Sequence, residues 1–355
     1  MPAKGSLKTK CFSGCLWRTE TKAMHLPHLT LAPMQGLCDD VMRDLLTRIG
    51  GYRECVSEFV RITHTVHSRP AWLRHVPELA HGCRTAAGVP CTVQLLGSDE
   101  TMLAANAVQA VRFGAAAIDL NFGCPAPTVN KHQGGAVLLK EPERIGRIVR
   151  AVRQSLPPHI PLSAKIRLGY DDTELALDNA QAVSENGAAL LTVHARTKAD
   201  GYRPPARWHW LLRIREHVSV PVCANGDVFT LDDYRAIREE SGCERIMLGR
   251  GAVIRPGLAR QIQAYECGGA AEEADFYGEV AGWIRLFFDL CRQKPSEKYP
   301  TARLKQWLGM MKTAYPEAER LFAAVRTLKS VEETAAVLAA FGGGQQHPLA
   351  AFQAA

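Results

Sequence analysis

The stretch CTVQLLGSDETMLAANAVQAVRFGAAAIDLNFG, residues 91–123, contains two short apolar runs separated by a longer amphipathic one. The runs at 91–97 and 116–123 have the length and apolar content of buried strands, whereas 99–114 has the spacing of a helix. A strand, a helix and a second strand in this order are typical of parallel strands joined by a crossover helix. The stretch therefore predicts an α/β fold with a parallel sheet.

The same alternation extends in both directions along the chain. It gives eight candidate strands, which are LTLAPM (29–34), ECVSEFV (54–60), CTVQLLG (91–97), AAIDLNFG (116–123), PLSAKIRLG (161–169), ALLTVHAR (189–196), VPVCANGDV (220–228) and RIMLGRGA (245–252). Eight strand-and-helix units over roughly 225 residues have the size of a (β/α)8 TIM barrel. We therefore predict a TIM barrel.

The chain changes character after Pro256, where amphipathic helical segments follow one another without strands. In one of them Leu304, Trp307, Leu308 and Met311 form an apolar stripe, which predicts a helix packed in a small bundle. We expect a disordered N-terminal extension at 1–25, a catalytic barrel domain at 26–256, a small all-helical domain at 257–341 and a disordered tail at 342–355.

Composition excludes several classes of protein. No apolar run approaches the roughly 20 residues that span a bilayer, which predicts a cytoplasmic protein without a membrane partner. The 11 cysteines are odd in number and include no C-x-x-C pair, so neither a disulfide framework nor a zinc site is indicated, and we expect no metal. Most of these cysteines are expected to be buried apolar side chains.

The net charge of +7 is unevenly distributed. Part of it lies in residues 1–22, which belong to the expected extension. A second excess lies between Gly282 and Lys312 in a segment that we expect to be folded. Because clustered cations bind phosphate groups, the second excess is the better candidate for a surface that contacts nucleic acid.

Polar side chains follow almost every candidate strand. The residues at the carboxyl ends of the candidate strands are, in order, Pro33 and Met34, Glu58 and Arg61, Gln94, Asn121 with Cys124, Lys165 with Arg167, His194 with Arg196, Asn225 with Asp227, and Gly249 with Arg250. A single polar residue at a strand end usually marks only the start of a loop. In a barrel, however, all these ends meet on one face, which is where barrel enzymes carry their active sites.

Two features of these strand ends indicate an anionic ligand. The glycines of ANGDV and LGRGA end the last two strands, where barrels commonly bind a phosphate, and Arg250 can contact the same group. Lys165 faces inward and needs a partner, because burying an unpaired lysine is costly. A flavin ring would supply that partner. A Schiff-base lysine is the alternative that the residues leave open.

The motifs LAPMQG, TVQLLG, DLNFGCP, KIRLG, VHARTKADGY, ANGDV and LGRGA, in this order, resemble the tRNA-dihydrouridine synthase family. The resemblance extends from about Leu29 to Leu328 and implies an oxidoreductase that uses FMN, and NADPH or alternatively NADH, to reduce uridine in tRNA. TARLKQWLGMM (301–311) and LFAAVRTL (321–328) further resemble the bacterial C-type branch, which acts on uridine 16 of the D loop.

The resemblance also implies roles for individual residues. Cys124 would be the general acid that protonates C5 of uracil while a hydride passes from flavin N5 to C6. The implied flavin contacts are Pro33, Met34, Gln35, Gln94, Lys165, His194, Asn225, Gly226, Asp227, Gly249 and Arg250. The implied tRNA contacts are Arg61, Asn121, Arg167, Arg303, Lys305 and Arg326. Independently, a free thiol is mostly protonated at pH 7 and can serve as an acid without an activating base.

Two other functions share parts of this pattern. A flavin enzyme that reduces a free pyrimidine, of the dihydroorotate type, would have the same phosphate site and inward lysine but no use for a basic helical domain. A non-catalytic tRNA-binding protein would have the basic domain but no flavin. We expect a monomer whose partner is tRNA.

Overall fold

The computed structural model describes residues 27–341, so the extension at 1–25 and the tail at 342–355 lie outside the described residues. All paired strands of the sheet are parallel. They are β1 (His28–Leu31), β2 (Glu54–Val56), β3 (Val60–Arg61), β4 (Cys91–Leu96), β5 (Ile118–Asn121), β6 (Leu162–Arg167), β7 (Leu190–His194), β8 (Val222–Asn225) and β9 (Arg245–Leu248).

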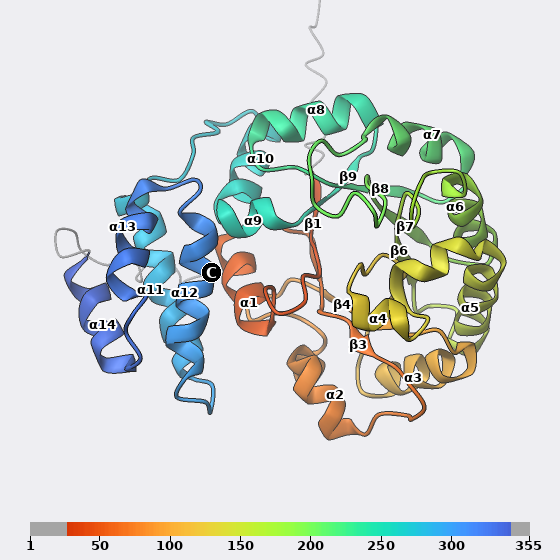
Figure 1. Cartoon of the computed structure of the whole chain (residues 1–355), viewed down its shortest axis with the longest axis horizontal. Coiled ribbons are helices and arrows are strands. Elements are labelled where there is room, and N and C mark those ends of the chain that lie inside the picture. Colours follow the sequence, from red (N-terminus) through yellow and green to blue (C-terminus); the bar gives the residue numbers. More distant parts are fainter. Residues whose placement is uncertain (1–26, 342–355) are drawn as a thin grey trace, which may run out of the picture.

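The sheet closes on itself, as Figure 1 shows. β1 pairs with β2 on one side and with β9 on the other, and β2 also pairs with β4. β2 and β3 both pair with β4, so they are two halves of one barrel strand. The result is an eight-stranded barrel, which confirms the predicted TIM barrel.

The predicted strand at 54–60 is interrupted at Ser57, and the structure gives a reason. The hydroxyl of Ser57 accepts a hydrogen bond from the backbone N–H of Gln94 at 3.1 Å and donates to the carbonyl of Glu58 at 2.9 Å. A side chain thus replaces part of the strand ladder at this point. The interruption lies beside Phe59, which lines the cavity described below.

Helices surround the barrel, as expected for crossover connections (Figure 1). They are α1 (Asp40–Ile49), α2 (Arg69–His75), α3 (Glu100–Arg112), α4 (Pro127–Lys131), α5 (Pro142–Ser155), α6 (Ala176–Glu185), α7 (His209–His217), α8 (Leu231–Ser241), α9 (Arg250–Ile254) and α10 (Leu258–Glu266). α3 matches the helix predicted at 99–114, and Asp99 caps its first turn by accepting from the N–H of Met102.

The C-terminal helices form a group beside α1 and α9 (Figure 1). They are α11 (Ala281–Arg292), α12 (Tyr299–Met311), α13 (Pro316–Val325) and α14 (Val331–Ala340). The predicted stripe of α12 is confirmed, because Leu304, Trp307, Leu308 and Met311 have no exposed surface. The indole N–H of Trp307 donates to the carbonyl of Val253 at 2.8 Å, which ties α12 to α9.

A group of polar side chains joins these helices to the barrel, and we call it the docking seam: Asp39, Asp40, Lys294, Tyr299 and Arg303. Arg303 pairs with Asp39 at 3.1 Å, Tyr299 donates to Asp39, and Lys294 pairs with Asp40. Arg303 is one of the residues expected to contact tRNA, and it is only 7% exposed. Because it stands four residues before Trp307, it shares the buried face of the helix.

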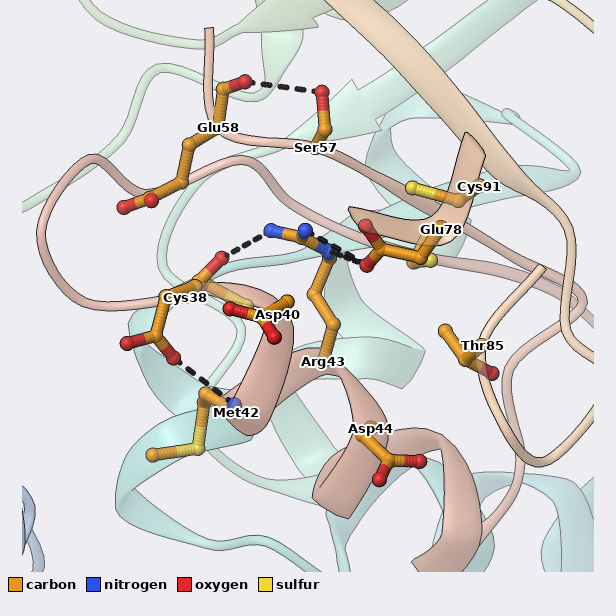
Figure 2. Close-up of polar contacts among 12 residues, drawn as sticks. Cys38, Asp40, Met42, Arg43, Asp44, Ser57, Glu58, Glu78, Thr85 and Cys91 are labelled. Atoms are coloured by element: carbon orange, nitrogen blue, oxygen red, sulfur yellow. Dashed lines mark hydrogen bonds and ion pairs between the residues drawn. The ribbon is translucent and has the colours of Figure 1, made fainter. Parts of the chain in front are cut away.

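A buried ion pair anchors α1 (Figure 2). The guanidinium of Arg43 contacts the carboxylate of Glu78 at 2.7 Å and donates to the carbonyl of Cys38 at 2.8 Å. Both side chains are almost fully buried. The contacts fix the end of the β1–α1 loop, whose residues Met34 and Gln35 line the cavity.

Candidate active site

A cavity of about 500 Å³ opens at the carboxyl ends of the barrel strands. Its size lies within the range of small-molecule sites, and the loops after most barrel strands contribute to it. It brings together most of the sequence-predicted residues, which are Pro33, Met34, Gln35, Asn121, Cys124, Lys165, Arg167, His194, Asn225, Gly226, Asp227, Gly249 and Arg250.

Lys165 projects from β6 into the cavity. Its ammonium donates to the side-chain oxygen of Asn225 on β8 at 2.9 Å, and Asn225 in turn donates to the carbonyl of Met247. Burial, aided by the charge of Arg167, lowers the pKa of Lys165 to about 8. The lysine is therefore mostly protonated at pH 7 and is stabilised by any anion that enters the cavity.

His194 lies beside Lys165 at the end of β7 and is neutral at pH 7. Burial is the main cause that lowers its pKa well below the usual value, and the charges of Arg167 and Lys165 add to it. Its Nε2 lies 3.4 Å from Nη1 of Arg196, which can only donate. In this contact Nε2 is the acceptor, which leaves the ring proton on Nδ1.

Cations outnumber carboxylates in the cavity wall. Within residues 27–341 the charged lining residues are Lys165, Arg167, Arg196, Arg250 and a single carboxylate, Asp227. Asp227 pairs with Arg196 and lies 3.6 Å from Arg250. The remaining positive charge predicts an anionic ligand.

The tips of β8 and β9 approach each other closely. A Cβ added to Gly251 would lie 1.9 Å from the carbonyl oxygen of Val228, so only glycine fits there. Asp227, next to Gly226, has a left-handed backbone with φ of 54°, a conformation that costs energy in residues other than glycine. Such strain is common at ligand sites, and the guanidinium of Arg250 projects beside it over the Tyr202 and Phe229 rings.

Cys124 is half-buried at the cavity wall, and burial raises the pKa of its thiol. It is therefore protonated at neutral pH. Its backbone is tightly held, because its N–H donates to Oδ1 of Asn121 at 3.0 Å and its carbonyl accepts from Nδ2 of Asn130 at 3.0 Å. The cysteines at 38, 55, 83, 91, 223, 243 and 291 are buried, as expected for apolar side chains.

Arg167 braces the same loop. Its guanidinium donates to the carbonyls of Gly123, Thr197 and Gly201 at 2.8, 3.0 and 3.1 Å and lies over the Tyr202 ring. These contacts join the loop after β5 to the loop after β7. Arg167 therefore lies in the cavity wall, where backbone carbonyls of two loops accept its hydrogen bonds.

The structure places five predicted site residues outside the cavity wall. Gln94 is fully buried beneath Asn121. Arg61 is exposed at the end of β3, and Arg326 is exposed at the end of α13. Lys305 donates to the carbonyl of Leu328, and Arg303 belongs to the docking seam.

Sequence reasoning missed several lining residues: Phe59, Arg196, Tyr202 and Phe229. Arg196 stood at a predicted strand end, and that position was the signal that could have assigned it to the site. The aromatic residues lie in loops whose course the sequence pattern does not predict. No group of His, Cys, Asp and Glu side chains in residues 27–341 could hold a metal ion, and no helix there is long and apolar enough to span a membrane.

A family model described as dihydrouridine synthase (Dus) matches residues 30–340. A protein of Neisseria meningitidis serogroup A named tRNA-dihydrouridine(16) synthase is 63% identical over 90% of this chain and 96% of its own. A protein of the same name from Aquipseudomonas alcaligenes is 52% identical over 88% of this chain and 98% of its own.

A solved structure, the histamine dehydrogenase from Rhizobium sp. 4-9, is similar in fold. It superposes with a TM-score of 0.52 at 14% identity and covers 90% of this chain and 63% of its own. At this identity the likeness concerns the fold alone, and it agrees with the barrel described above.

Proposed function

The chain belongs to the dihydrouridine synthase family, and on that premise we propose that it reduces the C5–C6 double bond of a uridine in tRNA, namely uridine 16 of the D loop. We propose FMN as its cofactor and NADPH as the reductant, with NADH as the alternative. The names of the two relatives support the choice of uridine.

The observation that carries the proposal is Cys124, a protonated thiol in the wall of a cavity that is rich in cations. Reduction of a carbon–carbon double bond requires a hydride and a proton. A thiol with a raised pKa retains its proton at neutral pH and can give it to a carbanion-like carbon. Nothing in this role requires a base beside the cysteine.

The residues present fit a flavin mononucleotide. Arg250 and the glycine tips of β8 and β9 suit the phosphate, and Lys165 suits the electron-rich edge of the ring. We propose the Nδ1–H of His194 as a further donor, and Pro33, Met34 and Gln35 also line the cavity. We propose that Asn225, Gly226, Asp227 and Gly249 complete the site, with Gln94 acting from beneath.

A bound reduced flavin would supply the hydride that C6 of the uracil needs. Cys124 transfers its S–H proton to C5, the thiolate that remains takes a proton from water, and the product is dihydrouridine. Asn121 and Arg167 orient the uracil from the same wall. Because a stacked base cannot reach a cavity in a barrel mouth, the uridine must leave its stack.

We further propose that residues 257–341 form a tRNA-recognition domain attached to a flavin-binding catalytic domain at 26–256. Arg61, Lys305 and Arg326 would contact RNA from the two domains, and Arg303 would act through the docking seam. The protein would act as a monomer in the cytoplasm. Clustered cations favour RNA, because they bind the phosphate backbone.

The test is to purify the protein, record its absorbance and assay dihydrouridine in tRNA from cells that lack the gene. We expect a yellow protein that restores dihydrouridine at position 16 with NADPH. A colourless protein that binds tRNA would indicate the non-catalytic function. Reduction of free uridine as fast as tRNA would indicate a pyrimidine reductase instead.

A further inference from the structure

We propose that Asp119 is a positioning residue for the proton donor, because its carboxylate sets the direction of a buried hydrogen-bond chain that ends on Cys124. The proposal rests on the proposed function only for the chemical role of Cys124. The chain of contacts itself belongs to the structure. Neither Asp119 nor Gln94 lines the cavity, so Asp119 would act only through others.

The chain runs between the neighbouring strands β4 and β5. Oδ2 of Asp119 accepts from Nε2 of Gln94 at 2.7 Å. Oε1 of Gln94 accepts from Nδ2 of Asn121 at 2.8 Å. Oδ1 of Asn121 then accepts from the backbone N–H groups of Gly123 and Cys124 at 2.9 and 3.0 Å. Three hydrogen bonds thus connect a buried carboxylate to the cysteine, and a fourth holds the N–H of Gly123.

The two ends of the chain fix its direction. An ionised carboxylate can only accept, and a backbone N–H can only donate. Gln94 and Asn121 lie between these ends, and each offers one donor group and one acceptor group. Only one orientation of the two amides satisfies every link, and it is the orientation that turns the oxygen of Asn121 toward Cys124.

An amide at position 119 would remove the restriction at the carboxylate end of the chain and leave only the two backbone N–H groups to fix its direction. Asparagine could present its NH₂ group to Gln94, Gln94 would then turn its own NH₂ group toward Asn121, and Asn121 would turn its NH₂ group toward two N–H donors. The loop of Cys124 would lose its anchor. Gln94 is fully buried and Asp119 is 3% exposed, so solvent cannot supply the missing partners.

A contribution to folding stability does not explain why position 119 has a carboxylate. Burial raises the pKa of Asp119 to about 6, although Ser163 at 2.5 Å and Gln94 both donate hydrogen bonds to it. An ionised group with a raised pKa destabilises the folded state at pH 7. A side chain that costs stability inside a functional site is expected to serve that site.

The test compares Asp119→Asn, Asn121→Asp and the double variant, with the exposed Asp178→Asn on α6 as the matched control. Iodoacetamide labelling of Cys124 is followed by peptide mass spectrometry, with Cys267 as the internal reference, since both thiols are half-buried. Turnover on tRNA and the thermal midpoint are measured on the same samples.

We expect Asp119→Asn to raise labelling of Cys124 roughly fivefold, the factor of one lost hydrogen bond. Turnover should fall roughly 10- to 100-fold, as expected for a displaced catalytic group, with the KM for tRNA unchanged. The thermal midpoint should not fall. The double variant should return labelling to the wild-type rate, because an amide at 119 and a carboxylate at 121 rebuild the chain in the opposite direction.

The proposal is overturned if Cys124 in Asp119→Asn is labelled at the wild-type rate and turnover is also that of the wild type. It is overturned as well if Cys124 in the double variant is labelled no more slowly than in the single variants. A thermal midpoint that falls together with turnover in Asp119→Asn would also overturn it. A wild-type protein that forms no dihydrouridine would refute the proposed function instead. The labelling comparison would still decide whether Asp119 positions Cys124.

Discussion

The cavity and the docking seam hold their charged side chains in opposite ways. In the cavity, cations face a space that contains a single carboxylate, Asp227. In the docking seam, Arg303 meets Asp39 and Lys294 meets Asp40. Cations without matching carboxylates mark a place for a ligand, whereas matched pairs mark a contact between two parts of one chain. Charge alone therefore does not distinguish binding from docking.

The largest expected effect concerns the chemistry of the cavity. Replacing Cys124 by alanine removes the proton donor, so dihydrouridine formation should fall by a factor on the order of 10² to 10⁴. Flavin content and tRNA affinity should be unchanged, because the contacts that hold this loop come from the backbone of residue 124 and remain in the variant. Mass spectrometry of the modified tRNA gives the turnover, and Cys267→Ala is the matched control. Full turnover of Cys124→Ala would refute the acid role.

The next largest effect is expected on the free energy of unfolding when the docking seam is broken. Arg303→Ala would leave Asp39 without its buried partner and should lower the free energy of unfolding by about 3 to 5 kcal/mol. The matched control is Arg326→Ala, an exposed arginine that should change it by less than about 0.5 kcal/mol. Urea unfolding measures both. Similar stabilities for the two variants would contradict the docking role of Arg303.

A pH series tests the cost of the buried carboxylate of Asp119. Its pKa rises from 3.8 to about 6 on folding, which corresponds to a cost on the order of 3 kcal/mol when it is ionised. The folded state therefore gains stability as pH falls from 7 through 6 toward 4, and loses it as pH rises. Lys165 and Glu54, the charged groups that act on Asp119, oppose each other.

The measurement is the difference in unfolding free energy between wild type and Asp119→Asn at pH 7 and at pH 5. The asparagine does not titrate, so the wild type should gain relative to the variant at the lower pH. If this difference in unfolding free energy does not change with pH, folding does not raise the pKa of Asp119.

The smallest expected effect concerns the exposed cations. Arg326→Ala should weaken tRNA binding modestly and reduce the slope of log affinity against log salt by about 1, the contribution of one phosphate contact. Stability should be unaffected because the side chain is exposed. Filter binding at several salt concentrations, with the exposed Arg74→Ala on α2 as a comparison, measures the slope. An unchanged slope would move the RNA surface away from the end of α13.

The barrel part of the site was predictable from sequence because of a geometric rule. Parallel strands in a closed barrel bring all their carboxyl ends together, so Lys165, His194 and Asn225 had to be neighbours once eight strands were recognised. The spacing of the apolar residues in α12 predicted its buried stripe for a similar reason. In both cases one repeating pattern determines where many side chains lie.

The remaining features depend on contacts between segments that no local pattern contains. Arg303 flanks the stripe of α12, and the sequence does not say whether that flank meets water or another domain. Gln94, which is expected to contact the flavin, lies beneath Asn121, and both ends of its amide make hydrogen bonds there. The register between β4 and β5 pairs Gln94 with Asp119, and this pairing determines where the Gln94 side chain lies.

The β1–α1 loop belongs to both regions. Met34 and Gln35 line the cavity, while the carbonyl of Gly36 accepts from Nε2 of Gln306 on α12 at 2.8 Å, and Asp39 binds Arg303. Few residues separate the two sets of contacts, so the loop cannot shift on one side without shifting on the other. If the helical region binds tRNA and the cavity binds the cofactor, as proposed, the shared loop would couple the two binding events, and such coupling is reciprocal. Whatever factor tRNA imposes on cofactor affinity, the cofactor imposes on tRNA affinity.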